Sequence, residues 1–129
     1  MKYLGIDYGT KKVGFAFSDD EGKVAFPDEV IPNTGDLIKQ TQQKIQERKV
    51  DEVVVGKSQT LQQKDNPVMK EIKIFVKNLK SKTDASIHFE PEFYTTVQAR
   101  RTRSNTTHLD ASAAALILQS FLDRRGKEK

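Results

Sequence analysis

Three consecutive valines, Val53–Val55, constrain the fold more than any other short stretch of this sequence. They follow two acidic residues and end at Gly56, so the apolar run has the length of a single β-strand. Successive side chains of a strand point to opposite faces, so a strand without a polar residue in its middle must be covered on both faces. We therefore predict a sheet with parallel strands and helices packed on both sides.

The apolar pattern on either side of this strand predicts the remaining elements. Three runs separated by turns predict an antiparallel meander, and later runs with helical spacing predict helices between and after the remaining strands. The predicted elements are, in order, strands Lys2–Ile6, Val13–Ser18 and Val24–Ile31 (broken at Pro27), a helix from Gly35-Asp36, the strand within Asp51–Gly56, a polar loop over 57–66, a helix from Asn66-Pro67, a strand Ala85–Phe89, a short helix Thr95–Arg101, a polar loop Ser104–Thr107 and a helix Asp110–Asp123.

This order predicts a single α/β domain over residues 1–129, in which a mixed sheet is packed between helices. The length is ordinary for one domain, and residues 124–129 are expected to form a frayed basic tail. The sequence has no cysteine, which fits a cytoplasmic protein, and no apolar stretch is long enough to suggest contact with a membrane.

The charge of the chain points to a polyanionic partner. The formal net charge is +4, and the excess of basic residues lies entirely in residues 65–129. Arg100, Arg101 and Arg103 stand close together with no acid among them. Such a basic patch suits nucleic acid, although a solvated surface would have the same composition.

Acidic residues fall at the ends of three predicted elements. Asp7 follows the first strand, Glu92 follows the fifth strand, and Asp110 opens the last helix. Asp110 lies four residues before Ala114, so it belongs to the apolar face that should point at the sheet. Each acid also has a structural explanation, as a turn, surface or helix N-terminal residue. Together they predict a carboxylate site for Mg²⁺ or Mn²⁺, both of which bind oxygen ligands.

Four stretches of the chain resemble one known family in order and spacing. They are "LGIDYGTKKVGFAFSD", "VVVGKS", "EFYTT" and "LDASAAALILQSFLDRR". They resemble the YqgF family, RuvX/RuvC-like proteins of the ribonuclease H superfamily that are described as Holliday junction resolvases and pre-16S rRNA nucleases. The resemblance implies a ribonuclease H-like fold: a five-stranded mixed sheet with its first three strands antiparallel and helices on both faces.

The resemblance also implies a metal-dependent nuclease with an acidic triad. Carried over by motif, the catalytic and metal-binding residues are Asp7, Glu92 and Asp110, with Mg²⁺ or Mn²⁺ as cofactor. The implied partner is structured RNA or branched DNA, bound by a monomer or homodimer. Gly9 would form the tight turn after the first strand. The expected nucleic-acid contacts are Thr10, Lys11, Lys12, Arg100, Arg101 and Arg103.

Two departures from the family pattern leave alternatives open. The family has Asp-Glu-Arg-Leu before its Thr/Ser pair, whereas this chain has Pro-Glu-Phe-Tyr, so Glu92 is assigned by its spacing to Thr95-Thr96 and Glu90 is the alternative ligand. The loop after Gly56 lacks the family's further glycines. A second hypothesis is therefore a weak or inactive nucleic-acid-binding module of the same fold, acting in RNA metabolism or transcription. A third, nucleotide binding through "GIDYGT", is disfavoured because one domain of this length cannot close around a nucleotide.

Overall fold

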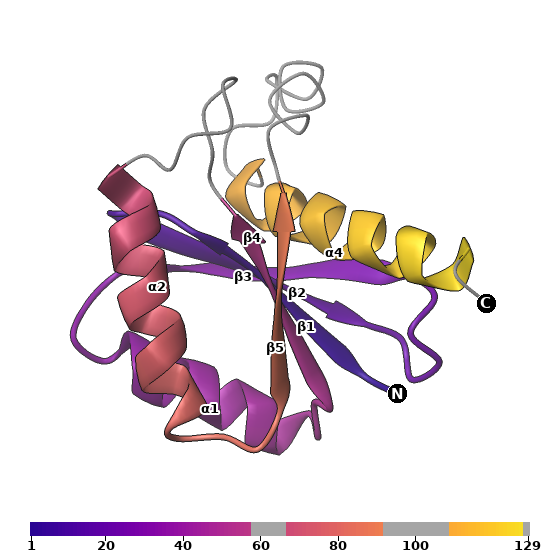
Figure 1. The fold of residues 1–129 in the computed structure, drawn as a ribbon, viewed down its shortest axis with the longest axis horizontal. Helices are drawn as coiled ribbons and strands as arrows, with labels where there is room; N and C mark the ends of the chain where they lie inside the picture. Colours follow the sequence, from indigo (N-terminus) through magenta and orange to yellow (C-terminus); the bar gives the residue numbers. More distant parts are fainter. Residues whose placement is uncertain (58–66, 92–108, 128–129) are drawn as a thin grey trace.

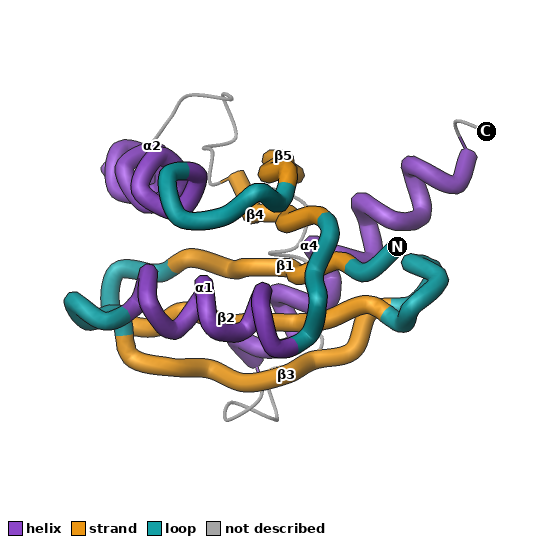
Figure 2. Tube along the Cα trace, turned by 90° about the horizontal axis from the view of Figure 1, so that it is seen from below, coloured by secondary structure: helices purple, strands orange, loops and turns teal. Residues whose placement is uncertain are grey.

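The computed structural model describes residues 1–57, 67–91 and 109–127 (Figure 1). Five strands form one sheet in the order β3-β2-β1-β4-β5, and Figure 2 shows them side by side in this order. The elements are β1 (Tyr3–Tyr8), β2 (Lys12–Ser18), β3 (Ala25–Pro32), α1 (Leu37–Glu47), β4 (Glu52–Lys57), α2 (Pro67–Lys80), β5 (Ser86–Pro91) and α4 (Leu109–Lys127).

The sheet is mixed, as the sequence predicted. β1, β2 and β3 are antiparallel neighbours, whereas β4 pairs in parallel with β1 and β5 pairs in parallel with β4. The carboxyl ends of β1, β4 and β5 therefore meet at one end of the sheet.

Helices cover both faces of the sheet (Figure 1). Val53 and Val55 pack into the core beneath α1 and α2, whereas Val54 packs into the second core beneath α4. All three side chains are completely buried, which confirms that this strand is covered on both sides. In the part of the chain described here, no helix is both long and apolar enough to cross a membrane.

The edge strand β3 differs from its predicted form. A strand over Val24–Ile31 was expected to break at Pro27, but β3 runs through this proline without interruption. Proline removes a backbone donor, which an edge strand tolerates because only one side of it is paired. The register of the pairing with β2 shifts between Gly14 and Ala16, so a local irregularity accommodates the proline.

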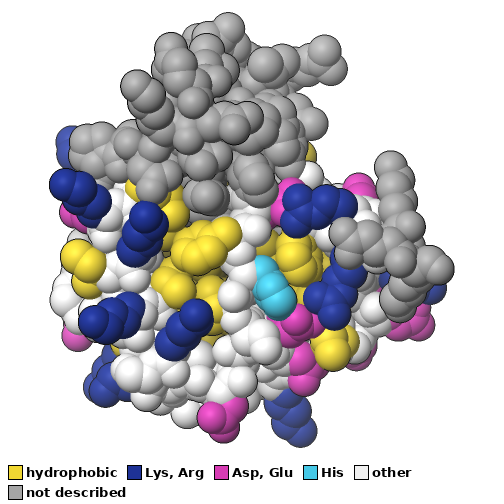
Figure 3. All heavy atoms as spheres, in the orientation of Figure 1, with side chains coloured by type: hydrophobic (Ala, Val, Ile, Leu, Met, Phe, Trp, Pro, Cys, Tyr) yellow, Lys and Arg dark blue, Asp and Glu magenta, His cyan; other side chains and the backbone are white. Residues whose placement is uncertain are grey.

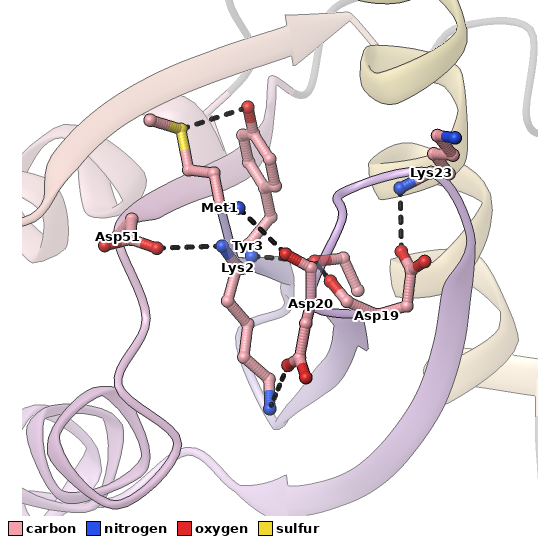
Figure 4. A network of polar contacts seen from close by, with 8 residues as sticks. Met1, Lys2, Tyr3, Asp19, Asp20, Lys23 and Asp51 are labelled. Atoms are coloured by element: carbon pink, nitrogen blue, oxygen red, sulfur yellow. Dashed lines mark hydrogen bonds and ion pairs between the residues drawn. The ribbon is translucent and has the colours of Figure 1, made fainter.

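The amino end of β1 is fixed by polar contacts on two sides (Figure 4). The Met1 ammonium donates to the Asp20 carbonyl oxygen in the turn between β2 and β3, at 2.8 Å. The Lys2 backbone N–H donates to Asp51 Oδ2 just before β4, also at 2.8 Å. These contacts fix the position of β1 along the strand direction relative to its neighbours, and therefore the position of its carboxyl end.

Helix α4 lies directly on β1 at Gly5. A Cβ placed on Gly5 would come within 2.7 Å of Leu118 Cβ and 3.0 Å of the Ala114 carbonyl oxygen. Both neighbours are fully buried, so the helix can relieve such a contact only by moving away from the sheet.

We predict that Gly5→Ala lowers the free energy of unfolding by about 1–3 kcal/mol, the usual cost of overpacking a core. Gly35→Ala is the matched control, because a Cβ at Gly35 would meet nothing within 4 Å. Denaturant-induced unfolding of the two variants measures the difference. Equal stability of both variants would show that α4 does not depend on this close approach.

Candidate active site at the carboxyl end of β1

Asp7 lies on the face of β1 that α4 covers. Leu4 and Ile6 point into the core beneath α1 and α2. Tyr3 packs in the core beneath α4, and Gly5 is the contact point of that helix. Because side chains alternate along a strand, Asp7 belongs to the same face as Tyr3 and Gly5. Its side chain is half-buried.

Asp7 lies inside β1 rather than after it. The sequence predicted a strand ending at Ile6, but the ladder with β2 continues through Asp7, which pairs with Gly14, and Tyr8, which pairs with Val13. The hairpin is tight, so the two strands remain paired almost up to the turn. Asp7 is therefore held by backbone pairing with β2 next to the sheet's end.

The same contacts place the beginning of α4 relative to β1. Phe121 packs against Tyr3, with ring centroids 6.0 Å apart, and Ala114 and Leu118 lie at Gly5. Helix α4 thus runs antiparallel to β1 along this face, and earlier helix residues lie nearer the strand's carboxyl end. Asp110 lies in the first turn of α4, one turn before Ala114, and its side chain is outside the described residues.

The turn between β1 and β2 requires the predicted glycine. A Cβ on Gly9 would lie 2.5 Å from the Lys12 carbonyl oxygen, which no side chain permits. Thr10, Lys11 and Lys12 follow, and all three are exposed. The predicted phosphate-binding residues of this turn are thus adjacent to Asp7 and accessible to a ligand.

Asn33 holds this turn, and sequence reasoning missed it. Its Nδ2 donates to the Gly9 carbonyl oxygen at 2.8 Å, and its backbone N–H donates to the Lys11 carbonyl oxygen at 2.9 Å. The residue lies directly after β3, so it reaches the turn only once β3 has paired with β2. An Asn in a polar loop carries no sequence signal for such a long-range role.

Glu90, the alternative ligand, lies in the same row of the sheet as Asp7. It pairs with Gly56 in β4, which directly follows Val55, the partner of Ile6 in β1, so Asp7 and Gly56 are the next residues along the two strands. Glu90 is 2% exposed, and Arg124 Nη2 of α4 lies 2.6 Å from its Oε1. The two groups form an ion pair that is not aligned as a hydrogen bond. Glu90 thus has a structural partner on α4.

Other predicted site residues fall outside the described ranges. These are Glu92, Arg100, Arg101 and Arg103, together with the predicted short helix, the polar loop after it and the loop over 58–66. Within residues 1–57, 67–91 and 109–127, no three His, Asp or Glu side chains gather closely enough to hold a metal ion. The described part of the predicted triad is the whole of Asp7 and the backbone of Asp110.

A polar cluster near the amino end of β4 anchors the far end of α4. His88 Nε2 lies 2.6 Å from Glu52 Oε1, and Arg125 Nη1 donates to the same oxygen at 3.3 Å. The His88 ring also packs against the ring of Phe121 in α4, with the ring centroids 5.2 Å apart. Residues 124–127, predicted as part of a frayed tail, instead continue α4, and Arg125 ties that continuation to the sheet.

The cluster shifts the titration of Glu52. Burial alone raises the pKa of a carboxyl group, because the charged form loses its hydration. The hydrogen bonds with His88 and Tyr3, together with the charge of Arg125, outweigh burial and hold the pKa of Glu52 below its ordinary value of 4.5. The ionised form of Glu52 therefore stabilises the folded chain.

Relatives of this chain match it over nearly its whole length. The model of the RuvX family, described as a Holliday junction resolvase, matches residues 1–124. A protein of Maridesulfovibrio salexigens named "Putative pre-16S rRNA nuclease" is 31% identical, and the match covers 96% of this chain and 99% of the relative. A protein of the same name from Lawsonia intracellularis is 32% identical, with 100% and 98% covered.

Solved structures of resolvases share the fold. RuvC of Thermus thermophilus has a TM-score of 0.65 and 15% identity, covering 98% of this chain and 97% of that one. The same protein in complex with its Holliday junction substrate has a TM-score of 0.65 and 13% identity, covering 98% and 96%. These similarities confirm the predicted ribonuclease H-like fold.

We predict that Glu52→Gln lowers the free energy of unfolding only at pH values at which Glu52 of the wild type is ionised. A carboxyl group with a depressed pKa contributes stability above its unfolded pKa, and this contribution disappears as pH falls through the folded value. The stability difference between wild type and Glu52→Gln should therefore be largest above about pH 5 and should vanish in stronger acid. Urea unfolding across this range measures it, with the exposed Glu47→Gln as control. A difference independent of pH would contradict this account.

Proposed function

The chain belongs to the RuvX family, and from this premise we propose that it is a divalent-metal-dependent nuclease that hydrolyses phosphodiester bonds in structured nucleic acid. The observation that carries this proposal is the position of Asp7, on the α4 face of β1 and at the end of the sheet toward which the first turn of α4 lies. The names of the relatives suggest a precursor of 16S rRNA or a Holliday junction as substrate. We also propose that the protein acts in the cytoplasm.

Asp7, Glu92 and Asp110 would hold the metal ion. Asp7 fits this role because Mg²⁺ and Mn²⁺ prefer carboxylate oxygens, and its side chain is half-buried at the carboxyl end of a central strand. A divalent ion supplies the positive charge that activates a water molecule and stabilises the leaving oxygen of a phosphodiester. Paired backbone on β1 fixes Asp7, and the packing of α4 on Gly5 fixes the turn that carries Asp110.

Basic residues beside the acids would hold the substrate's phosphates. Lys11 and Lys12 are exposed on the turn that follows Asp7, and Thr10 adds a hydroxyl donor. We assign the same role to the arginines at 100, 101 and 103 from their charge and position in the sequence. Such contacts bind the backbone without reading its sequence, and their strength falls with salt concentration.

The two candidate substrates place different demands on the assembly. Symmetric cleavage of a four-way junction needs two active sites, which a homodimer would provide. Trimming the end of a ribosomal RNA precursor needs only one active site, and a monomer suffices. The oligomeric state in solution therefore helps to separate the two substrates.

We predict that Asp7→Asn abolishes cleavage and leaves nucleic-acid binding nearly unchanged. The substitution keeps the size of the side chain but removes a charged ligand, so the loss should exceed the roughly 10–100-fold effect of an outer-shell partner. Cleavage of labelled precursor rRNA and junction DNA, with and without Mg²⁺ or Mn²⁺, measures it. Asp36→Asn is the control, because the exposed Asp36 side chain makes no cap hydrogen bond. Full activity of Asp7→Asn would refute the nuclease proposal, and binding without cleavage in wild type would favour the inactive module.

Two single substitutions, one at Glu92 and one at Glu90, distinguish which of these residues is the metal ligand. We predict that Glu92→Gln lowers cleavage as strongly as Asp7→Asn without changing the free energy of unfolding. Glu90→Gln should instead destabilise the fold, because it leaves Arg124 without its buried carboxylate. Cleavage rates and melting temperatures of both variants decide the assignment, and the opposite pattern would make Glu90 the ligand.

A further inference from the structure

Four lysines form one row along α2. Lys70, Lys73, Lys77 and Lys80 are spaced by three, four and three residues, which places them on the same side of a helix. All four are exposed. The row spans about 15 Å, at about 1.5 Å of helix rise per residue. The resemblance and the motifs of the sequence assign no role to it.

The row lies on the side of α2 that faces away from α1. The side of the helix toward α1 carries Glu71, Ile74 and Asn78, which line a cleft of about 290 Å³ shared with α1. The buried side of α2, which includes Ile72 and Leu79, packs on the sheet. The lysines therefore lie along the side of α2 next to β5, the edge strand of the sheet.

An aromatic ring is exposed on that edge. Phe89 of β5 is 37% exposed, although it pairs with Val55, which is completely buried. Val55 points into the core beneath α1 and α2, so Phe89 belongs to the same face of the sheet as α2. Figure 3 shows an apolar patch between α2 and β5, with Lys and Arg side chains gathered along its α2 side.

The row starts at the end of the sheet where Asp7 lies. β5 begins beside Glu52, so α2 must run from the carboxyl end of the parallel strands back toward their amino end. Lys70 is in the first turns of α2 and Lys80 is its last residue. A strand bound along this row would therefore lead away from the proposed active site.

We propose that the four α2 lysines and Phe89 form a binding surface for a single-stranded segment of the nucleic-acid substrate. Lysines in a row neutralise successive phosphates, and an exposed ring offers a face on which an unpaired base stacks. A second copy of this chain is a poorer occupant, because a symmetric contact would bring two lysine rows together. The inference rests on the proposed function and specifies the substrate as one with an unpaired tail.

The test measures binding in the absence of divalent metal, so that cleavage does not interfere. The probe is a fluorescent RNA strand of about 12 nucleotides, within the range that one such site covers, used alone and annealed to its complement. The first variant is Lys70→Glu/Lys77→Glu, and its control is Lys23→Glu/Lys39→Glu, which makes the same change in net charge at exposed positions elsewhere. The second variant is Phe89→Leu, with Phe26→Leu on the opposite edge strand as its control, because Phe26 is also exposed.

We expect the α2 variant to bind the single strand at least about tenfold more weakly and to lower the slope of log K against log salt by about 1–2, since two phosphate contacts are lost. Phe89→Leu should weaken binding about fivefold or more without changing that slope, because stacking is not ionic. Neither control should differ from wild type. Lys70→Gln/Lys77→Gln gives a milder version of the first variant if the charge reversal reduces folding.

Three results would overturn the proposal: no binding of the single strand by wild type, an α2 variant that binds as its control does, or a loss confined to the duplex. The cleavage assay of Asp7→Asn is independent of this result. Cleavage by wild type with no effect of the α2 variant on binding would reject the surface and keep the nuclease. Binding that depends on α2, without any cleavage, would keep the surface and reject the nuclease.

Discussion

The contact between α4 and the backbone of Gly5 determines how the two halves of the proposed active site meet. A helix ordinarily packs on a sheet through side chains of both partners, but here Leu118 and the Ala114 carbonyl approach a strand position that has no side chain. This brings the helix axis closer to β1 than any other residue would allow. Asp7 lies two residues along the strand from this contact, and Asp110 one turn back along the helix.

Electrostatic contacts hold the opposite end of α4. Arg125 shares Glu52 Oε1 with His88, and Arg124 lies against the buried Glu90. Charged groups at such depth are favourable only when they are paired, so these contacts fix which residues of α4 lie over β4 and β5. The packing at Gly5 sets the distance of the helix from the sheet, and the ion pairs set its position along the sheet.

Local patterns were sufficient to predict the mixed sheet and to place Asp7 near the carboxyl end of the first strand, although that strand continues through Asp7 to Tyr8. The valine run required a strand covered on both faces, and the glycine after Tyr8 marked a tight turn, because both depend on neighbouring residues alone. The continuation of β3 through Pro27 could not be predicted. A strand tolerates proline when it lies at the edge of a sheet, and the sequence does not show which strand is the edge. Asn33, Glu52 and the lysine row on α2 were also missed. The first two act through partners far away in the sequence. The lysine row suggests a binding surface only together with the exposed ring of Phe89 on β5, which the sequence does not place near α2.

The faces of the sheet to which Asp7 and Phe89 belong have a consequence for the shape of the substrate. Asp7 belongs to the face covered by α4, whereas Phe89 and α2 lie on the other face. A strand that touches both must bend around the rim of the sheet within a few nucleotides. Double-stranded DNA stays nearly straight over roughly 150 base pairs, so such a bend is costly for a continuous helix. A flexible joint in the nucleic acid, where pairing ends or strands exchange, makes this bend at little cost. The stiffness of the nucleic acid would then itself select the position of the proposed cut.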